Sequence, residues 1–180
     1  MRLFIAILFD DGIKNILYRT VDQLKECSKG SYTAKENLHL TVNFIGETDR
    51  FSDIKQIMER SVEETTAKEF QISIRGLGKF KRREGDIYWI GVEKEDTLWK
   101  LQKELANKLK ESGFPDIEMK EYQPHLTMGR KIHVNPGFEF REFEAGIEPL
   151  WMTVNKISLM KSERLQGKLV YTEIFNVKLE

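Results

Sequence analysis

The order of apolar and polar residues predicts a chain that mixes strands with amphipathic helices. Short apolar runs rich in β-branched and aromatic residues predict buried strands. These runs lie at Arg2–Phe9, Leu38–Ile45, Phe70–Phe80, Ile87–Val92, His125–Ile132, Val154–Met160 and Leu169–Val177. Apolar residues at helical spacing predict three helices, whose inner faces run over Ile13–Leu24, Ile54–Val62 and Leu98–Leu109.

Polar segments and capping residues mark the ends of these elements. Lys81–Gly85 predicts a turn and Ser162–Lys168 predicts a polar loop, whereas Asn135–Gly146 has no periodicity that assigns it to an element. The residues expected to cap the second and third helices are Ser52 or Asp53 and Asp96 or Thr97.

One succession of elements occurs twice. A strand, a helix and a strand that carries His-Leu-Thr follow one another from Arg2 to Ile45 and again from Ile87 to Ile132. The sequences between are not alike, so the repeat is one of architecture. It predicts two α+β lobes, each of which contributes one His-Leu-Thr strand. The 180 residues are enough for a single domain, residues 1–180, made of two such lobes.

Composition and charge narrow the possible functions. The 29 basic and 29 acidic residues give a formal net charge of zero, so an anionic ligand must be held by local groups rather than by a general cationic field. The single cysteine, Cys27, excludes an internal disulfide and fits a reducing compartment, so we expect a cytoplasmic location. The N-terminal apolar run is short and ends at Asp10, which favours a buried strand over a signal peptide. No segment is long enough to span a membrane.

Two of the three histidines stand in the same tripeptide, His-Leu-Thr. Side chains alternate along a strand, so His39 shares a face with Thr41, and His125 shares a face with Thr127. The other face of each strand is apolar and can pack on a helix. The residues expected to be buried there are Leu40, Val42, Leu126 and Met128. One such tripeptide usually marks a half-buried histidine in a sheet, but two copies in matching positions favour a shared site.

A pair of histidines suits in-line attack on a phosphodiester. A neutral imidazole takes a proton from the nucleophile and an imidazolium gives a proton to the leaving oxygen, and both forms are present near neutral pH. The hydroxyls of Thr41 and Thr127 can donate hydrogen bonds to the non-bridging oxygens. We expect His125 to act as the base and His39 as the acid, with their nearest ring nitrogens roughly 5–7 Å apart across one phosphate.

Metal binding is the rival interpretation of these histidines. A catalytic zinc site needs three protein ligands. The third histidine, His133, lies in a polar stretch beyond the second tripeptide, and neither His-x-His nor His-Glu-x-x-His spacing occurs. The sequence therefore favours a site without a metal or another cofactor.

These residues carry a resemblance that covers nearly the whole chain. The segments RLFIAI, NLHLTVNFIGE, GLGKF, YWIGV and PHLTMGR, with Ser162, Gly167 and Tyr171 near the C-terminus, are similar to those of the 2H phosphoesterase superfamily. Within it, the chain resembles the RNA 2′,3′-cyclic phosphodiesterases, also called 2′-5′ RNA ligases. The resemblance implies a bilobal α+β fold, in which two pseudo-symmetric lobes each have a mainly antiparallel sheet and helices. It also implies an active-site cleft between the lobes.

The same resemblance implies roles for particular residues. His39 and His125 match the catalytic histidines, and Thr41 and Thr127 match the threonines that bind the phosphate.

Two neighbouring positions bear on substrate binding. The resemblance implies that Arg130 binds substrate, but alternation puts it on the face opposite His125 unless the strand bends near Gly129. Many relatives carry Lys or Arg where this chain has Asn43, which alternation puts on the same face as His39. The change removes a possible cation from the cleft.

Other candidates have a functional and a structural interpretation. A basic turn, either an RNA grip or a solvated hairpin tip, is formed by Lys79, Lys81, Arg82 and Arg83 around Phe80. Tyr122 either stacks on a base or packs in the core. Trp89 and Trp99 stand at apolar-periodic positions and are expected in the core.

The sequence thus predicts a monomeric, metal-independent enzyme that opens 2′,3′-cyclic phosphate ends of RNA and leaves a 2′-phosphate. One alternative is a 2′-5′ RNA ligase or a hydrolase of another cyclic or 2′,5′ phosphoester. A second alternative is a non-catalytic module that binds RNA ends, against which the presence of both histidines and both threonines argues.

Overall fold

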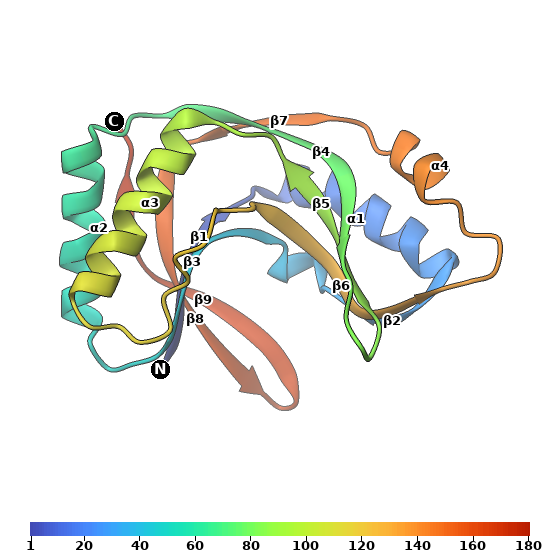
Figure 1. The fold of residues 1–180 in the computed structure, drawn as a ribbon, viewed down its shortest axis with the longest axis horizontal. Coiled ribbons are helices and arrows are strands. Elements are labelled where there is room, and N and C mark those ends of the chain that lie inside the picture. The colour runs from blue at the N-terminus through green and yellow to red at the C-terminus, as the bar shows by residue number, and fades with distance from the viewer.

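The protein folds as two antiparallel β-sheets with helices, which confirms the predicted α+β class (Figure 1). The computed structural model describes residues 1–180. One sheet has the strand order β3 (His39–Glu47), β1 (Arg2–Leu8), β8 (Lys156–Leu165) and β9 (Lys168–Lys178). The other has the order β2 (Ser28–Tyr32), β6 (His125–Val134), β5 (Asp86–Val92), β4 (Phe70–Phe80) and β7 (Leu150–Val154). Each His-Leu-Thr strand therefore belongs to its own sheet, as predicted.

The helices cover the two sheets in a crossed arrangement. α2 (Phe51–Thr65) and α3 (Asp96–Glu111) pack together and contact the four-stranded sheet, whereas α1 (Asp11–Glu26) and α4 (Phe140–Ala145) contact the five-stranded sheet. α1 thus follows β1 along the chain but covers the other sheet, and α3 follows β5 but covers the first. Each strand–helix–strand unit of the repeat is shared between the two lobes. No helix is both long and apolar enough to cross a membrane.

A single hydrophobic cluster of 36 buried residues joins the two sheets and the first three helices. Leu40 and Val42 of β3 and Leu126 and Met128 of β6 belong to it, so the apolar face predicted for each motif strand is confirmed. Burying an apolar side chain of this size contributes about 1.5–3 kcal/mol. The packing that builds the core therefore also holds the opposite face of each strand, with its histidine and threonine, in place.

The C-terminal region differs from the prediction. The expected strand Val154–Met160 corresponds to β8, but its bounds are wrong, because β8 runs from Lys156 to Leu165 and Val154 is the last residue of β7. The expected polar loop Ser162–Lys168 is also wrong, because it contains the end of β8, a tight turn at Gln166 and Gly167, and the start of β9. Both turn residues have positive φ, which suits a two-residue hairpin. The hairpin projects from the fold (Figure 1), so its tip lacks the alternation of a half-buried strand.

Four short elements were absent from the prediction, and one of them is the edge strand β7, of which the predicted strands include only Val154. β2 has the polar sequence SKGSY and lies at the edge of its sheet, so no apolar alternation marks it. α4 lies within Asn135–Gly146, where no periodicity assigned an element, and it has no buried side chain. A 3-10 helix, η1 (Lys35–Asn37), leads into β3.

The expected helix caps are wrong. α2 begins at Phe51 without a side-chain cap. α3 is capped by Glu95, whose carboxylate accepts a hydrogen bond from the Leu98 backbone N–H at 2.8 Å. The expected caps lie inside the first turns, namely Ser52 and Asp53 in α2 and Asp96 and Thr97 in α3.

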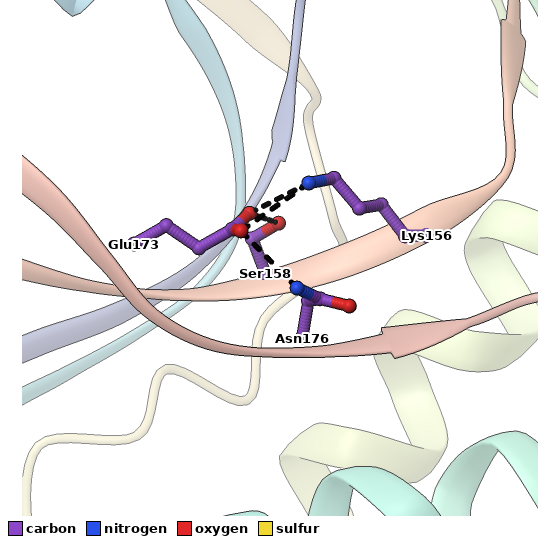
Figure 2. A network of polar contacts seen from close by, with 4 residues as sticks. All are labelled: Lys156, Ser158, Glu173 and Asn176. Carbon is purple, nitrogen blue, oxygen red and sulfur yellow. Dashed lines mark hydrogen bonds and ion pairs between the residues drawn. The ribbon is translucent and has the colours of Figure 1, made fainter.

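A polar network fixes the pairing of β8 with β9 (Figure 2). The Glu173 carboxylate accepts hydrogen bonds from the Ser158 hydroxyl at 2.6 Å and from the Lys156 ammonium at 2.9 Å. The Asn176 amide donates to the same carboxylate at 3.1 Å. Burial raises the pKa of Glu173, but these hydrogen bonds outweigh it and hold the pKa below its usual value. Because Ser158 is fully buried, its hydroxyl needs this partner. The network anchors β9, which carries Tyr171.

Candidate active site

The two motif strands approach each other between the sheets. β3 and β6 are in contact although they belong to different sheets. Tyr122, on the segment that leads into β6, donates a hydrogen bond from its hydroxyl to the Thr41 carbonyl at 2.7 Å. Burial raises the pKa of Tyr122, so the hydroxyl keeps its proton and remains a donor. The segment that leads into the second motif is thereby hydrogen-bonded to the backbone of the first motif.

Both imidazoles are held by the same local arrangement. Nδ1 of His39 lies 2.7 Å from the carbonyl oxygen of Asn37, and Nδ1 of His125 lies 2.7 Å from the carbonyl oxygen of Gln123. In each case the acceptor stands two residues before the histidine. An Nδ1–H that donates to a carbonyl leaves Nε2 as the nitrogen that can exchange a proton. Nε2 of His39 lies 2.9 Å from the Thr41 hydroxyl.

Aromatic rings of its own sheet surround His39. Phe4 of β1 and Tyr171 of β9 have their ring centroids 5.0 and 5.1 Å from the imidazole centroid. These two rings also lie 5.0 Å from each other. The triangle of rings restricts the orientation of the imidazole and removes part of it from water.

His125 has a matching pair of rings on the other sheet. Phe80 of β4 and Trp89 of β5 have their centroids 5.0 and 5.7 Å from the imidazole centroid. The indole of Trp89 lies directly over Gly78, where any Cβ would overlap it. The prediction that Trp89 is a core residue is therefore wrong, because its ring is half-buried, lies outside the hydrophobic cluster and packs beside His125.

A β-bulge after the first motif changes the face of β3 on which each later side chain lies. Val42 is an extra residue in β3 relative to β1. As a result Asn43 is buried, and its amide nitrogen lies 3.5 Å from a carbonyl oxygen of α3. The expectation that Asn43 faces the cleft beside His39 is therefore wrong. Phe44 instead pairs with Phe4, and its ring is 41% exposed.

A second bulge lies at the same place in the other motif. Met128, one residue after the threonine, is an extra residue in β6 relative to β5. The bulge lies beside Gly129, where the expected role of Arg130 requires a bend in the strand. The positive charge of Arg130 is one cause of the lowered pKa of both His39 and His125.

Burial is the main cause that lowers the pKa of both histidines. For His39, the hydrogen bond to the Asn37 carbonyl opposes this effect, and the charges of His125, Lys14 and Arg130 lower the pKa further. Both imidazoles are therefore mainly neutral at pH 7 in the free protein. A bound phosphate favours the charged form, so an anionic substrate itself helps to create the acid.

The remaining candidates have mixed outcomes. Tyr122 packs against Trp99, with ring centroids 5.2 Å apart, so the contacts favour its interpretation as a core residue.

Lys14 of α1 is a site residue that the sequence did not indicate, because nothing in the helical spacing points to the neighbouring sheet. Its ammonium donates to the Glu36 carbonyl at 3.1 Å and lies near enough to His39 to lower the pKa of the imidazole.

The basic turn lies at the exposed tip of the β4–β5 hairpin. The Lys79 ammonium is paired with Asp86 at 3.5 Å, and the Arg82 guanidinium lies 5.5 Å from the centroid of the Phe80 ring.

The third histidine, His133, has its Nε2 3.1 Å from the Glu84 carbonyl oxygen. No group of three or more His, Cys, Asp or Glu side chains is arranged to hold a metal ion.

A family model described as the 2′-5′ RNA ligase superfamily matches residues 14–166. The chain belongs to this superfamily. The predicted 2H phosphoesterase relationship is thereby confirmed.

Similar proteins agree with this assignment. A protein of Thermotoga maritima named RNA 2′,3′-cyclic phosphodiesterase is 29% identical, covering 100% of this chain and 96% of its own. One of the same name from Methanothermobacter thermautotrophicus is 32% identical, covering 97% and 96%. Among solved structures, E. coli LigT complexed with 3′-AMP has a TM-score of 0.73 at 22% identity, covering 99% and 96%. A protein of Thermus thermophilus, TT0787, has a TM-score of 0.75 at 22% identity, covering 99% and 98%. The two structures share the fold.

Proposed function

We propose that the protein is an RNA 2′,3′-cyclic phosphodiesterase that uses two histidines and no metal, and leaves a 2′-phosphate. The enzyme class follows from the superfamily and from full-length relatives that carry this name. One observation carries the two-histidine mechanism. Two imidazoles from different sheets are each held through Nδ1 by the carbonyl two residues earlier, on strands that contact each other.

In the proposed reaction, water attacks the phosphorus of the cyclic phosphate. Nε2 of His125 takes the proton of the water as its oxygen bonds to phosphorus, and the bond from phosphorus to the 3′ oxygen breaks. Nε2 of His39 gives a proton to this 3′ oxygen, so the phosphate stays on the 2′ oxygen. The choice of base is supported by the free Nε2 of His125, since that of His39 already contacts the Thr41 hydroxyl.

The other proposed residues act on the charge of the phosphoryl group. The hydroxyls of Thr41 and Thr127 donate hydrogen bonds to the non-bridging oxygens, whose negative charge grows in the transition state. Arg130 adds a positive charge, and its influence on the pKa of both histidines supports this position. We also propose that residues 1–180 act as one domain of two lobes, which the shared hydrophobic cluster supports.

The test is to incubate the protein with an RNA oligonucleotide that ends in a 2′,3′-cyclic phosphate and to map the product phosphate. We expect a 2′-phosphate, formed at the same rate with and without EDTA. A 3′-phosphate would contradict the proposed leaving group, and activity that EDTA abolishes and zinc or manganese restores would contradict the metal-free mechanism. Joining of ends without hydrolysis would favour the ligase alternative. Binding without turnover would favour the binding module.

A further inference from the structure

A group of arginines without acidic partners lies beside the candidate active site. Arg2 of β1, Arg130 of β6 and Arg164 of β8 all contribute to lowering the pKa of Tyr171, although burial of this tyrosine outweighs them. None of the three forms an ion pair, although the chain has as many acidic as basic residues. Glu47, the cross-strand neighbour of Arg2, lies instead 3.5 Å from the N-terminal amine.

The strand register puts Arg2 and Arg164 on the face of the four-stranded sheet that carries His39. Arg2 lies directly opposite Ser162, which lies opposite Tyr171 on the next strand. Arg164 follows Ser162 by two residues and therefore shares its face. Tyr171 contacts the imidazole of His39, so this row of side chains begins beside the acid–base pair, and it continues along β8 toward the tip of the hairpin. Figure 1 shows this hairpin projecting from the fold.

An exposed aromatic ring completes this surface. The bulge at Val42 turns Phe44 to the face of Phe4, and the Arg2 guanidinium lies 5.1 Å from the centroid of the Phe44 ring. Phe44 stands five residues after His39, just as Arg130 stands five residues after His125. A nucleic-acid base can stack on such an exposed ring, and the cation beside the ring can bind a phosphate.

We propose that Phe44, Arg2 and Arg164 form a second RNA subsite. The two arginines bind the phosphodiester on the 5′ side of the terminal nucleotide, and the Phe44 ring stacks on the preceding base. The RNA strand then leaves the site across the four-stranded sheet rather than past the basic turn at Lys81–Arg83. Two carboxylates lie at that turn, since Asp86 pairs with Lys79 and Glu84 lies 4.0 Å from the Lys131 ammonium, and these acidic groups disfavour a phosphate beside Lys81–Arg83.

This subsite rests on the proposed function, and substrate length separates the two. Adenosine 2′,3′-cyclic phosphate has only the reacting phosphate, whereas the dinucleotide ApA with a 2′,3′-cyclic end also has the extra phosphodiester and base. We expect the ratio of kcat/KM for the dinucleotide to that for the mononucleotide to be well above one in the wild-type protein. Phe44→Ala, Phe44→Leu and Arg2→Gln should each lower this ratio about tenfold, the scale of one stacked base or one phosphate contact.

The chain offers a matched control and a variant at an exposed position. Trp151, on the edge strand β7, is 58% exposed with the Arg75 guanidinium 5.3 Å from its ring centroid, so Trp151→Ala removes a similar exposed pair and should leave the ratio unchanged. Arg164→Gln changes an exposed hairpin residue and should reduce the dependence of the dinucleotide KM on salt.

The outcomes separate the two proposals. If the wild-type protein hydrolyses neither substrate, the proposed function and the subsite both fail. If it hydrolyses both and the ratio is unchanged in the Phe44, Arg2 and Arg164 variants, the subsite is wrong and the function stands. A ratio that falls only when Lys81, Arg82 and Arg83 are neutralised would also overturn the subsite and assign the strand path to the basic turn.

Discussion

His39 and Tyr171 are in edge-to-face contact, with ring centroids 5.1 Å apart, although their strands are the two edges of the same four-stranded sheet. Asn37, which lies just before β3, makes a second contact between these edges. Its side-chain amide donates a hydrogen bond to the Leu169 carbonyl of β9 at 2.9 Å. The β8–β9 hairpin therefore curls toward β3 near Leu169 and Tyr171, and the ring of Tyr171 packs beside the histidine.

This contact predicts that Tyr171 controls the acidity of His39. Burial lowers the pKa of His39, so Tyr171→Ala, which uncovers one side of the imidazole, should raise that pKa toward its usual value. Tyr171→Phe keeps the ring and should leave the pKa of His39 close to that of the wild type. NMR titration of the imidazole protons measures both. An unchanged pKa in Tyr171→Ala would mean that the ring does not shield His39.

Arg130 should set the pH dependence of the reaction. Its positive charge disfavours both imidazolium forms and lowers both pKa values, so Arg130→Gln should raise the pKa of His39 and of His125. Since kcat/KM reports the pKa values of the free enzyme, both limbs of its pH profile should move to higher pH. The maximum should also fall, because a charge near the phosphate is lost.

The matched control for this variant is Arg60→Gln, which removes an exposed arginine of α2 and should leave the profile in place. If Arg130→Gln shifts neither limb, its guanidinium does not act on the histidines.

Gly78 should be required for the position of His125. A Cβ at this residue would overlap the indole of Trp89, so Gly78→Ala should displace the ring and lower the free energy of unfolding by about 1–3 kcal/mol, the usual cost of overpacking. It should also reduce kcat, because Trp89 contacts the imidazole. Gly146→Ala, where a Cβ makes only ordinary contacts, is the control. Wild-type stability and turnover in Gly78→Ala would contradict this role.

Much of the site could be predicted because a strand has a two-residue period. His39 and Thr41 share a face, and the buried Leu40 and Val42 hold the other face, as alternation requires. The facing of Asn43 could not be predicted in the same way. It depends on a bulge that exists only in the pairing of β3 with β1, and pairing between distant strands leaves no periodic signal in either one.

Part of the fold could not be predicted for a similar reason, because it depends on contacts between segments that are distant in the sequence. The apolar stripe of α1 predicts that the helix packs on a sheet, but the stripe does not say which of two sheets it covers. The β8–β9 hairpin is polar at its tip because it leaves the core, so its extent could be found only from the backbone pairing of residues such as Leu165 and Lys168. Tyr171 stood out in the sequence, but its contact with His39 depends on the curl of this hairpin.

In the proposed reaction two histidines, and no metal, act on one phosphate. Single-turnover hydrolysis of an RNA dinucleotide with a 2′,3′-cyclic end, measured in EDTA, tests it most directly. We expect full activity in the wild-type protein, a loss of about a hundredfold or more in His39→Ala and in His125→Ala, and a smaller loss in Thr41→Ala and Thr127→Ala. Each threonine variant removes only one of several donors, and all four variants should unfold at temperatures close to that of the wild type. A full rate in either histidine variant would contradict the two-histidine mechanism.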